Sequence, residues 1–135
     1  MSKPIPTVQK FMTYNPYSIN DDAAITEAVN LMEDKKIRHI PVMKENKIFG
    51  ILSDRDIKLA LSIADTDPEN IKVGDICHAH LYQVAPDAPL NQVANEMAEH
   101  HYGCAVVLQN NKLVGIFTAV DACRALATIL EQRKN

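Results

Sequence analysis

In the stretch Gly50-Ile51-Leu52-Ser53-Asp54-Arg55-Asp56-Ile57, the end of an apolar segment is followed directly by four polar residues. A second copy lies 65 positions later, at Gly115-Ile116-Phe117-Thr118-Ala119-Val120-Asp121-Ala122. Both copies keep the glycine, the isoleucine, a hydroxyl residue and the final aspartate at matching offsets. An apolar run followed by Ser or Thr and then by an acidic residue is typical of a strand that ends where a helix begins. The chain is therefore predicted to contain this strand–turn–helix unit twice.

The duplication extends well beyond these two turns. When Ser18–Ile57 is aligned with Gln83–Ala122, no gap is needed and ten of the forty positions are identical. Composition alone would give roughly two or three identities. The same offset pairs Val8–Met12 with Val73–Cys77. We infer an internal repeat that covers most of the chain.

Each repeat is predicted to contain a lead-in with a short extended piece, a helix, two strands and a closing helix. The first helices carry apolar residues at the i, i+3, i+4, i+7 spacing of an amphipathic helix, beginning at Ile25 and at Leu90. Asp22 and Asp87 are predicted at the N-cap or in the first turn, and Pro89 at the first helical position. The other expected segments are the lead-ins Val8–Tyr17 and Val73–Tyr82, the strands His39–Lys44, Lys47–Ser53, Cys104–Gln109 and Lys112–Phe117, and the closing helices Arg55–Ala64 and Ala119–Gln132.

This order of elements predicts the α+β class, with two pseudo-symmetric repeats of the pattern β-α-β-β-α. The two long strands of each repeat are joined at Glu45-Asn46 and at Asn110-Asn111, where Asn tolerates the positive φ of a tight hairpin. Pro41 removes one donor from its strand, which favours an edge or a pocket at that position. The predicted division is an N-terminal tail (1–7), repeat one (8–64), a polar linker (65–72), repeat two (73–130) and a C-terminal tail (131–135).

The composition argues against several classes of function. The chain has 135 residues, a net charge of −3 and a pI near 5.9, and it lacks the basic clusters that nucleic-acid binding needs. The N-terminal residues lack the apolar run of a secretory signal, and no run approaches the ~20 apolar residues of a membrane helix. Three cysteines without metal-like spacing are typical of a reduced protein. We therefore expect a cytoplasmic protein with no nucleic-acid partner and no membrane segment.

The first turn has the chemistry of a nucleotide site. If Ser53 is the N-cap, the first helical turn offers free N–H groups and the positive end of the helix dipole to a phosphate. Arg55 can add a bidentate phosphate contact, and the carboxylate of Asp56 can accept two hydrogen bonds from the hydroxyls of a ribose. Gly50 and Ile51 would leave room and an apolar wall for a flat base. The turn is thus predicted to offer contacts to the phosphate, the sugar and the base of a nucleotide.

A purely structural interpretation explains the same residues. A Ser or Thr before a helix is most often only a cap, and an Asp in a first turn often only interacts with the helix dipole. The repetition of the pattern favours a ligand, although duplication alone would also preserve a structural cap. Both interpretations stay open at this point.

The chain resembles the family of tandem cystathionine β-synthase (CBS) domains, a pair of which is also called a Bateman module. The resemblance runs from Val8 to about Leu130. The motifs that carry it are Phe11-Met12-Thr13 with Pro16, Glu27-Ala28 with Leu31-Met32, Ile37-Arg38-His39-Ile40-Pro41-Val42, and the two Gly-Ile-x-Ser/Thr-x-x-Asp turns. The resemblance implies two repeats packed through their sheets, with clefts between them that bind AMP, ADP, ATP or S-adenosylmethionine as a regulatory ligand, with no required cofactor.

Carried over residue by residue, the resemblance assigns ribose binding to Asp56 and Asp121 and phosphate binding to Ser53 and Thr118. The base is expected against the extended lead-in and the strand around Pro41. The residues nominated there are Ile19, Ile40 and Pro41 in repeat one, and Val84 and Ala105 in repeat two.

The two sites are not expected to be equal. Repeat two carries Val120 in place of Arg55, and Gly103 in place of Arg38, so it has lost two cations. We expect the site of Ser53, Arg55 and Asp56 to bind phosphate better. His39 is either a ligand-binding group or a surface histidine of its strand.

The closing helices carry apolar bands wider than one small core needs, which favours packing against a second chain. We expect a homodimer that signals through its own assembly or in trans to an unidentified protein target. The alternative function is a ligand-free structural dimerisation module. No catalytic motif is present, and His78, His80, His100 and His101 do not form a convincing metal set, so we expect neither an enzyme nor a metal site.

Overall fold

The computed structural model describes residues 4–63, 65 and 67–133. The chain forms two compact units, one of Pro16–Leu81 and one of Met1–Asn15 together with Tyr82–Asn135. These units differ from the sequence repeats, because the lead-in of each repeat belongs to the unit of the other. The reason lies in the packing: Val8 donates its N–H to Ala88 O at 2.9 Å, and Val73 donates to Ala23 O at 2.8 Å.

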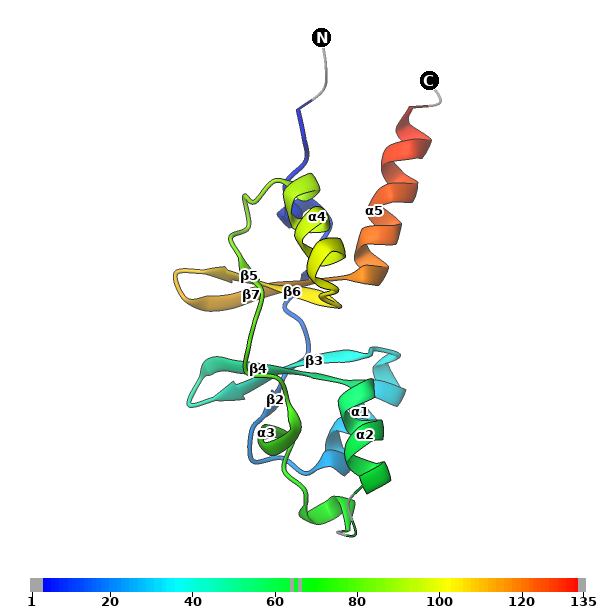
Figure 1. Cartoon of the computed structure of the whole chain (residues 1–135). Coiled ribbons are helices and arrows are strands. Elements are labelled where there is room, and N and C mark those ends of the chain that lie inside the picture. Colours follow the sequence, from blue (N-terminus) through cyan, green and yellow to red (C-terminus); the bar gives the residue numbers. More distant parts are fainter. Residues whose placement is uncertain (1–3, 64, 66, 134–135) are drawn as a thin grey trace. The chain divides into compact units, whose positions relative to one another are not determined.

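The unit of Pro16–Leu81 has a three-stranded sheet in the order β2-β3-β4. Strand β2 is parallel to β3, and β3 is antiparallel to β4. Helices α1 and α2 cover one face of this sheet (Figure 1). The elements are β2 (Ile19–Asn20), α1 (Ile25–Lys35), β3 (His39–Lys44), β4 (Lys47–Ser53), α2 (Asp54–Ile63), η2 (Pro68–Asn70) and α3 (Val73–Ile76).

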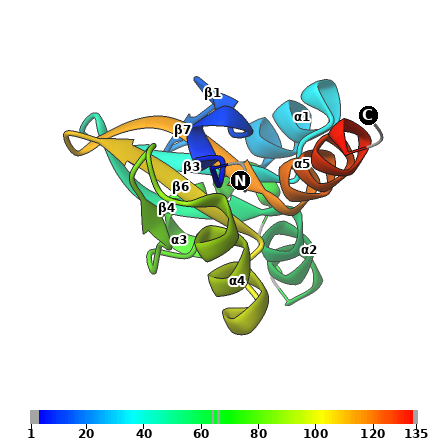
Figure 2. The same ribbon diagram turned by 90° about the horizontal axis from the view of Figure 1, so that it is seen from above.

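The second unit repeats this plan with one additional strand. Its sheet has the order β1-β7-β6-β5, and Figure 2 shows β1 beside β7, with which it pairs in antiparallel fashion. Helices α4 and α5 lie on one face of this sheet. The elements are η1 (Val8–Lys10), β1 (Thr13–Tyr14), β5 (Gln83–Val84), α4 (Leu90–His100), β6 (Cys104–Gln109), β7 (Lys112–Thr118) and α5 (Ala119–Gln132).

Most of the predicted elements are confirmed, and so is the α+β class with two repeats. Both hairpins turn through residues with positive φ: 51° and 65° at Glu45 and Asn46, and 53° and 64° at Asn110 and Asn111. The predicted helix from Arg55 to Ala64 begins one residue earlier, at Asp54, and Ala64 lies outside the described residues.

The predicted starts of the first helices are wrong. The N-cap residues are Ala24 and Pro89, so Asp22 and Asp87 precede the caps and Pro89 lies one position earlier than expected. The lead-ins explain the later start, because Ala24 forms a bridge with Lys72 and Pro89 forms one with Thr7. This pairing holds the backbone before each helix extended.

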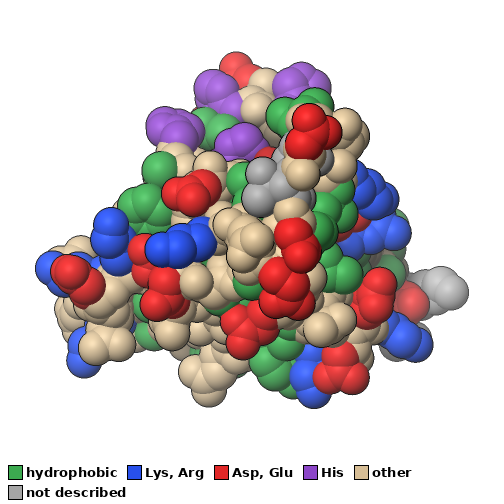
Figure 3. Space-filling view, turned by 90° about the horizontal axis from the view of Figure 1, so that it is seen from below, with side chains coloured by type: hydrophobic (Ala, Val, Ile, Leu, Met, Phe, Trp, Pro, Cys, Tyr) green, Lys and Arg blue, Asp and Glu red, His purple; other side chains and the backbone are tan. Residues whose placement is uncertain are grey.

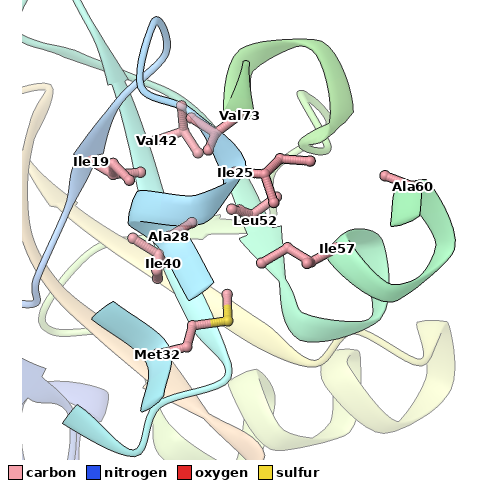
Figure 4. Close-up of a cluster of buried hydrophobic side chains, with 10 residues drawn as sticks. All are labelled: Ile19, Ile25, Ala28, Met32, Ile40, Val42, Leu52, Ile57, Ala60 and Val73. Atoms are coloured by element: carbon pink, nitrogen blue, oxygen red, sulfur yellow. The ribbon is translucent and has the colours of Figure 1, made fainter. Parts of the chain in front are cut away.

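The core of each unit lies between its helices and its sheet. Figure 4 shows ten buried side chains of the Pro16–Leu81 unit. Ile40 and Val42 of β3 point toward α1 and α2, because alternate residues of a strand face the same side. Val73 completes this core from α3. Across the residues described, none of the helices combines the length and apolarity that a membrane crossing requires.

Candidate functional site

Ser53 and Asp56 link the end of β4 to the start of α2 by two reciprocal hydrogen bonds. Ser53 N donates to Asp56 Oδ2 at 2.9 Å, and Asp56 N donates to Ser53 Oγ at 3.2 Å. This is a capping box, with Asp in the position usually held by Glu or Gln. It confirms that Ser53 caps the helix. The carboxylate of Asp56 is buried at the helix start, and its Oδ2 is the oxygen that takes part in the cap.

Thr118 and Asp121 form the same arrangement at the start of α5. Thr118 N donates to Asp121 Oδ2 at 3.0 Å, and Asp121 N donates to Thr118 Oγ1 at 3.2 Å. Asp121 is also buried, and Arg124 Nη1 lies 3.8 Å from its Oδ1. The two motifs therefore present a fixed hydroxyl, a fixed carboxylate and the N-terminus of a helix in the same geometry.

Each motif carboxylate also contacts a side chain of the lead-in that packs beside it. His78 Nε2 lies 2.7 Å from Asp56 Oδ1. Thr13 Oγ1 donates to the carboxylate of Asp121, at 3.2 Å to Oδ1 and 3.3 Å to Oδ2. Thr13 and His78 are themselves 65 positions apart, so they are equivalent residues of the two repeats.

His39 lies next to the first motif, opposite Ser53 in the pairing of β3 with β4. Burial lowers the pKa of His39, and the carboxylates of Asp54 and Asp56 offset part of this effect. The guanidinium of Arg38 lowers the same pKa further. The half-buried imidazole of His39, next to the motif, therefore favours its neutral form.

The two predicted arginines are exposed. Arg55 is in the first turn of α2, and the carbonyl of Arg38 accepts a hydrogen bond from Asp54 N at 3.0 Å. The phosphate contact of Arg55 and the ligand-binding role of Arg38 stay predictions.

Most of the apolar residues nominated for the base belong to, or pack against, the hydrophobic cores of the two units. Ile19 and Ile40 belong to the core of the Pro16–Leu81 unit, and Ala105 belongs to the core of the other unit, with Val84 packed against it. Pro41 is fully buried and pairs with Ile51, so it lies on the opposite side of β3 from Ile40. The role of these residues in binding a base stays a prediction.

The space expected beside Gly50 is filled by the chain itself. A Cβ atom at Gly50 would lie 2.6 Å from His78 O and 2.9 Å from Cys77 Sγ. The backbone of the lead-in is held there by two bonds of 2.9 Å between Ile51 and His78. The glycine is therefore needed for the approach of the lead-in, and the expectation that it leaves room for a base is wrong in this structure.

A shallow hollow of about 570 Å³ lies in the same unit, away from Asp56. Ile19 is the only nominated ligand residue in its lining, and two of the lining residues are acidic, which disfavours an anion. The lining residues are Ser18, Ile19, Glu27, Asn30, Leu31 and Asp34.

Sequence reasoning missed His78 and Thr13 as neighbours of the motif carboxylates. The repeat offset shows that they are equivalent, but it does not show which carboxylate each one reaches. A separate cluster on α4, formed by Glu96, Glu99 and His100, brings three ligand-type atoms within 4.8 Å of one another. Two of these residues are exposed and the third is half-buried, so the cluster has the character of a charged helix surface.

Comparisons with known proteins agree on one family. A family model for the CBS domain matches residues 1–63 and 73–128. Hypoxic response protein 1 of Mycobacterium tuberculosis is 27% identical over 121 residues, which cover 89% of this chain and 85% of that protein.

Two solved structures illustrate the similarity in fold. A Vibrio cholerae protein described as an acetoin utilization protein (AcuB) is 30% identical with a TM-score of 0.88, and the match covers 97% of each chain. CBSX2, solved in complex with AMP, is 27% identical with a TM-score of 0.77, covering 91% of this chain and 97% of that one.

Proposed function

Because this chain belongs to the CBS domain family, we propose that it is a regulatory module that binds an adenosine-containing ligand. The candidates are AMP, ADP, ATP and S-adenosylmethionine. CBS domain pairs are typically regulatory modules, and the related CBSX2 was solved with AMP. The function is binding rather than catalysis, so we expect the ligand to be recovered unchanged after incubation.

The observation that carries this proposal is the position of the Asp56 carboxylate. One oxygen is held by Ser53 N, and the other faces a side chain that is largely exposed, since the side chain of His78 is 71% accessible. A carboxylate oxygen has two lone pairs, so we expect Oδ1 to accept a second donor, such as a ribose hydroxyl, from the exposed side of the His78 imidazole. In the first turn of α2, Asp54 N donates to Arg38 O and Asp56 N donates to Ser53 Oγ, so of these first three N–H groups that of Arg55 remains for a phosphate.

A ligand-free dimerisation module is the second candidate. The capping boxes are complete without a ligand, as a structural cap requires. Large apolar side chains are also exposed on the closing helices, and Figure 3 shows apolar side chains at the surface between charged ones. The exposed apolar residues are Leu59, Leu61 and Ile63 on α2, and Val120, Leu126 and Leu130 on α5. We propose that these faces pair in a homodimer, and that the signal passes through this dimer or to a protein target in the cytoplasm.

The experiment that separates the two functions uses Asp56→Asn. Asn keeps an oxygen for Ser53 N but loses the charge and one acceptor, so it removes the ribose site with little change to the cap. Thermal melts with each of the four ligands should show a shift for the wild type. At about 100 times the Kd, a ligand adds about 2.7 kcal/mol, which is on the order of 10 °C for a domain of this size.

The shift should be absent in Asp56→Asn and unchanged in Asp65→Asn, the same chemical change in the exposed linker. Light scattering should give the same oligomeric state for the wild type and both variants. If the wild type shows no shift with any ligand, the dimerisation module is the better description.

A further inference from the structure

The outward face of α5 carries a stripe of exposed apolar residues. Asp121 and Ala125 are buried, and they mark the side of α5 that faces its own unit. With 3.6 residues per turn, four apolar residues fall together on the opposite side of the helix. We call them the α5 stripe, and all four are exposed: Val120, Cys123, Ala127 and Leu130. The core of the unit therefore does not use this stripe.

The α5 stripe has the pattern of a helix that pairs with a copy of itself. Its residues follow the 3-4-3 spacing of the a and d positions in a coiled coil. The small residues Cys123 and Ala127 occupy the middle, and the larger Val120 and Leu130 occupy the two ends. Spacing and size are therefore nearly the same when read in either direction, as a symmetric pair of antiparallel helices requires.

The residues beside the α5 stripe favour the antiparallel direction. Arg124 and Glu131 lie seven residues apart on one rim of the stripe, and Leu126 lies on the other rim. In an antiparallel pair each rim faces the same rim of the partner helix, so Arg124 faces an acidic residue and Leu126 faces a second leucine. A parallel pair would place Leu126 against the charged rim. The side chain of Arg124 is 72% accessible at 3.8 Å from Asp121, which leaves it free to reach a partner chain.

The equivalent helix of the other repeat, α2, is not suited to this pairing. The positions that match the α5 stripe hold polar or charged residues, namely Arg55, Lys58, Ser62 and Asp65. A pair of α2 helices would have to remove these charges from water, which costs free energy. The two closing helices therefore differ in the face that they offer to a second chain.

We propose that α5 packs against α5 of a second copy, antiparallel to it and around a two-fold axis. Val120 then packs on the partner's Leu130, and Cys123 packs on the partner's Ala127. This inference rests on the proposed homodimer and makes it more specific, because it selects one of the two closing helices and fixes the direction of the pair.

The first test is disulfide crosslinking of the full chain with diamide. Ala127→Cys should give a covalent dimer, because the new thiol lies beside Cys123 of the partner. The wild type should give little, because two copies of Cys123 are offset by about 6 Å along the helix axes, which makes their Cα atoms too distant for a disulfide. Trypsin cleaves after Arg124, so mass spectrometry of the covalent dimer distinguishes the two thiols. Adding Cys123→Ser to Ala127→Cys should remove the crosslink.

The second test measures the Kd of the dimer by analytical ultracentrifugation. Leu126→Glu and Leu61→Glu make the same change at equivalent positions of the two repeats. Leu126→Glu should raise the Kd about tenfold or more, because it places two carboxylates where two leucines are buried. Leu61→Glu should change the Kd by less than about twofold, as an exposed substitution does. The two leucines are 60% and 43% accessible in the single chain, so both variants should keep the circular dichroism spectrum of the wild type.

The outcomes separate this inference from the dimer on which it rests. If the wild type is a monomer in both tests, the proposed homodimer fails, and the thermal melts still decide ligand binding. If the wild type is a dimer that crosslinks through two copies of Cys123, the antiparallel direction is overturned and the homodimer stands. Equal weakening by Leu61→Glu and Leu126→Glu would overturn the selection of α5.

Discussion

His39 has its imidazole half-buried beside the motif hydroxyl, where charging it is unfavourable. Burial lowers its pKa below the ordinary value near 6.5, although Asp54 and Asp56 oppose the change. In the unfolded chain the same group keeps its ordinary pKa. The unfolded state therefore binds more protons as the pH falls, which couples the stability of this unit to pH.

We expect the stabilisation from a neutral His39 to be fully present above about pH 6.5 and to be lost as the pH falls through the folded-state pKa. Between about pH 7.5 and pH 5, the melting temperature of the wild type should fall more than that of His39→Gln. The control is His80→Gln, which removes an exposed histidine of the same unit. Equal losses in the wild type and in His39→Gln would contradict this assignment.

At the scale of elements, the lead-ins pack against the long strands only because each strand has a glycine at the crossing. Gly50 of β4 faces the backbone oxygen of His78, and Gly115 of β7 faces the sulfur of Met12. The packing between elements is thus enough to explain the glycine of each repeated turn, and no ligand is needed for that explanation.

Gly50→Ala should destabilise the protein by about 1–3 kcal/mol, because the added Cβ would lie 2.6 Å from a backbone oxygen that cannot move alone. Gly115→Ala should cost less, because its nearest neighbour, at 2.5 Å, is the end of a flexible methionine. Urea unfolding measures both values, with Gly103→Ala at an exposed position as the control. The opposite ranking of the two variants would refute this explanation.

At the scale of the whole molecule, each compact unit is completed by a segment from the other sequence repeat. Val8 and Val73 are equivalent in sequence, and both are fully buried. Val8 lies in the core with α4 and α5, and Val73 lies in the core with α1 and α2. A repeat as defined by sequence therefore lacks part of its own core.

This exchange predicts the behaviour of fragments. Residues 16–81 should retain more helix and melt more cooperatively than residues 1–63, because only the first fragment contains Val73 for the core around Ile25. Circular dichroism melts and the dispersion of amide resonances measure the difference. Equal or better folding of residues 1–63 would show that the exchanged segment contributes little.

The sequence by itself determined the duplication, the two long hairpins, and the amphipathic faces of the helices. These features depend on local chemistry: apolar spacing, the positive φ that Asn110 and Asn111 tolerate, and the hydroxyl and carboxylate of each capping box. The four long strands agree with their predicted bounds to within one residue for this reason.

Only the tertiary structure decided which lead-in completes which unit. Further results depend on that choice: the N-caps at Ala24 and Pro89, the neighbours of Gly50, and the placement of His78 at Asp56 and of Thr13 at Asp121. The physical reason is that the repeats are alike. Val8 and Val73 fit the same kind of core, so the pattern of apolar residues does not distinguish the two pairings. The choice depends on packing and chain connectivity over many residues, which no local pattern records.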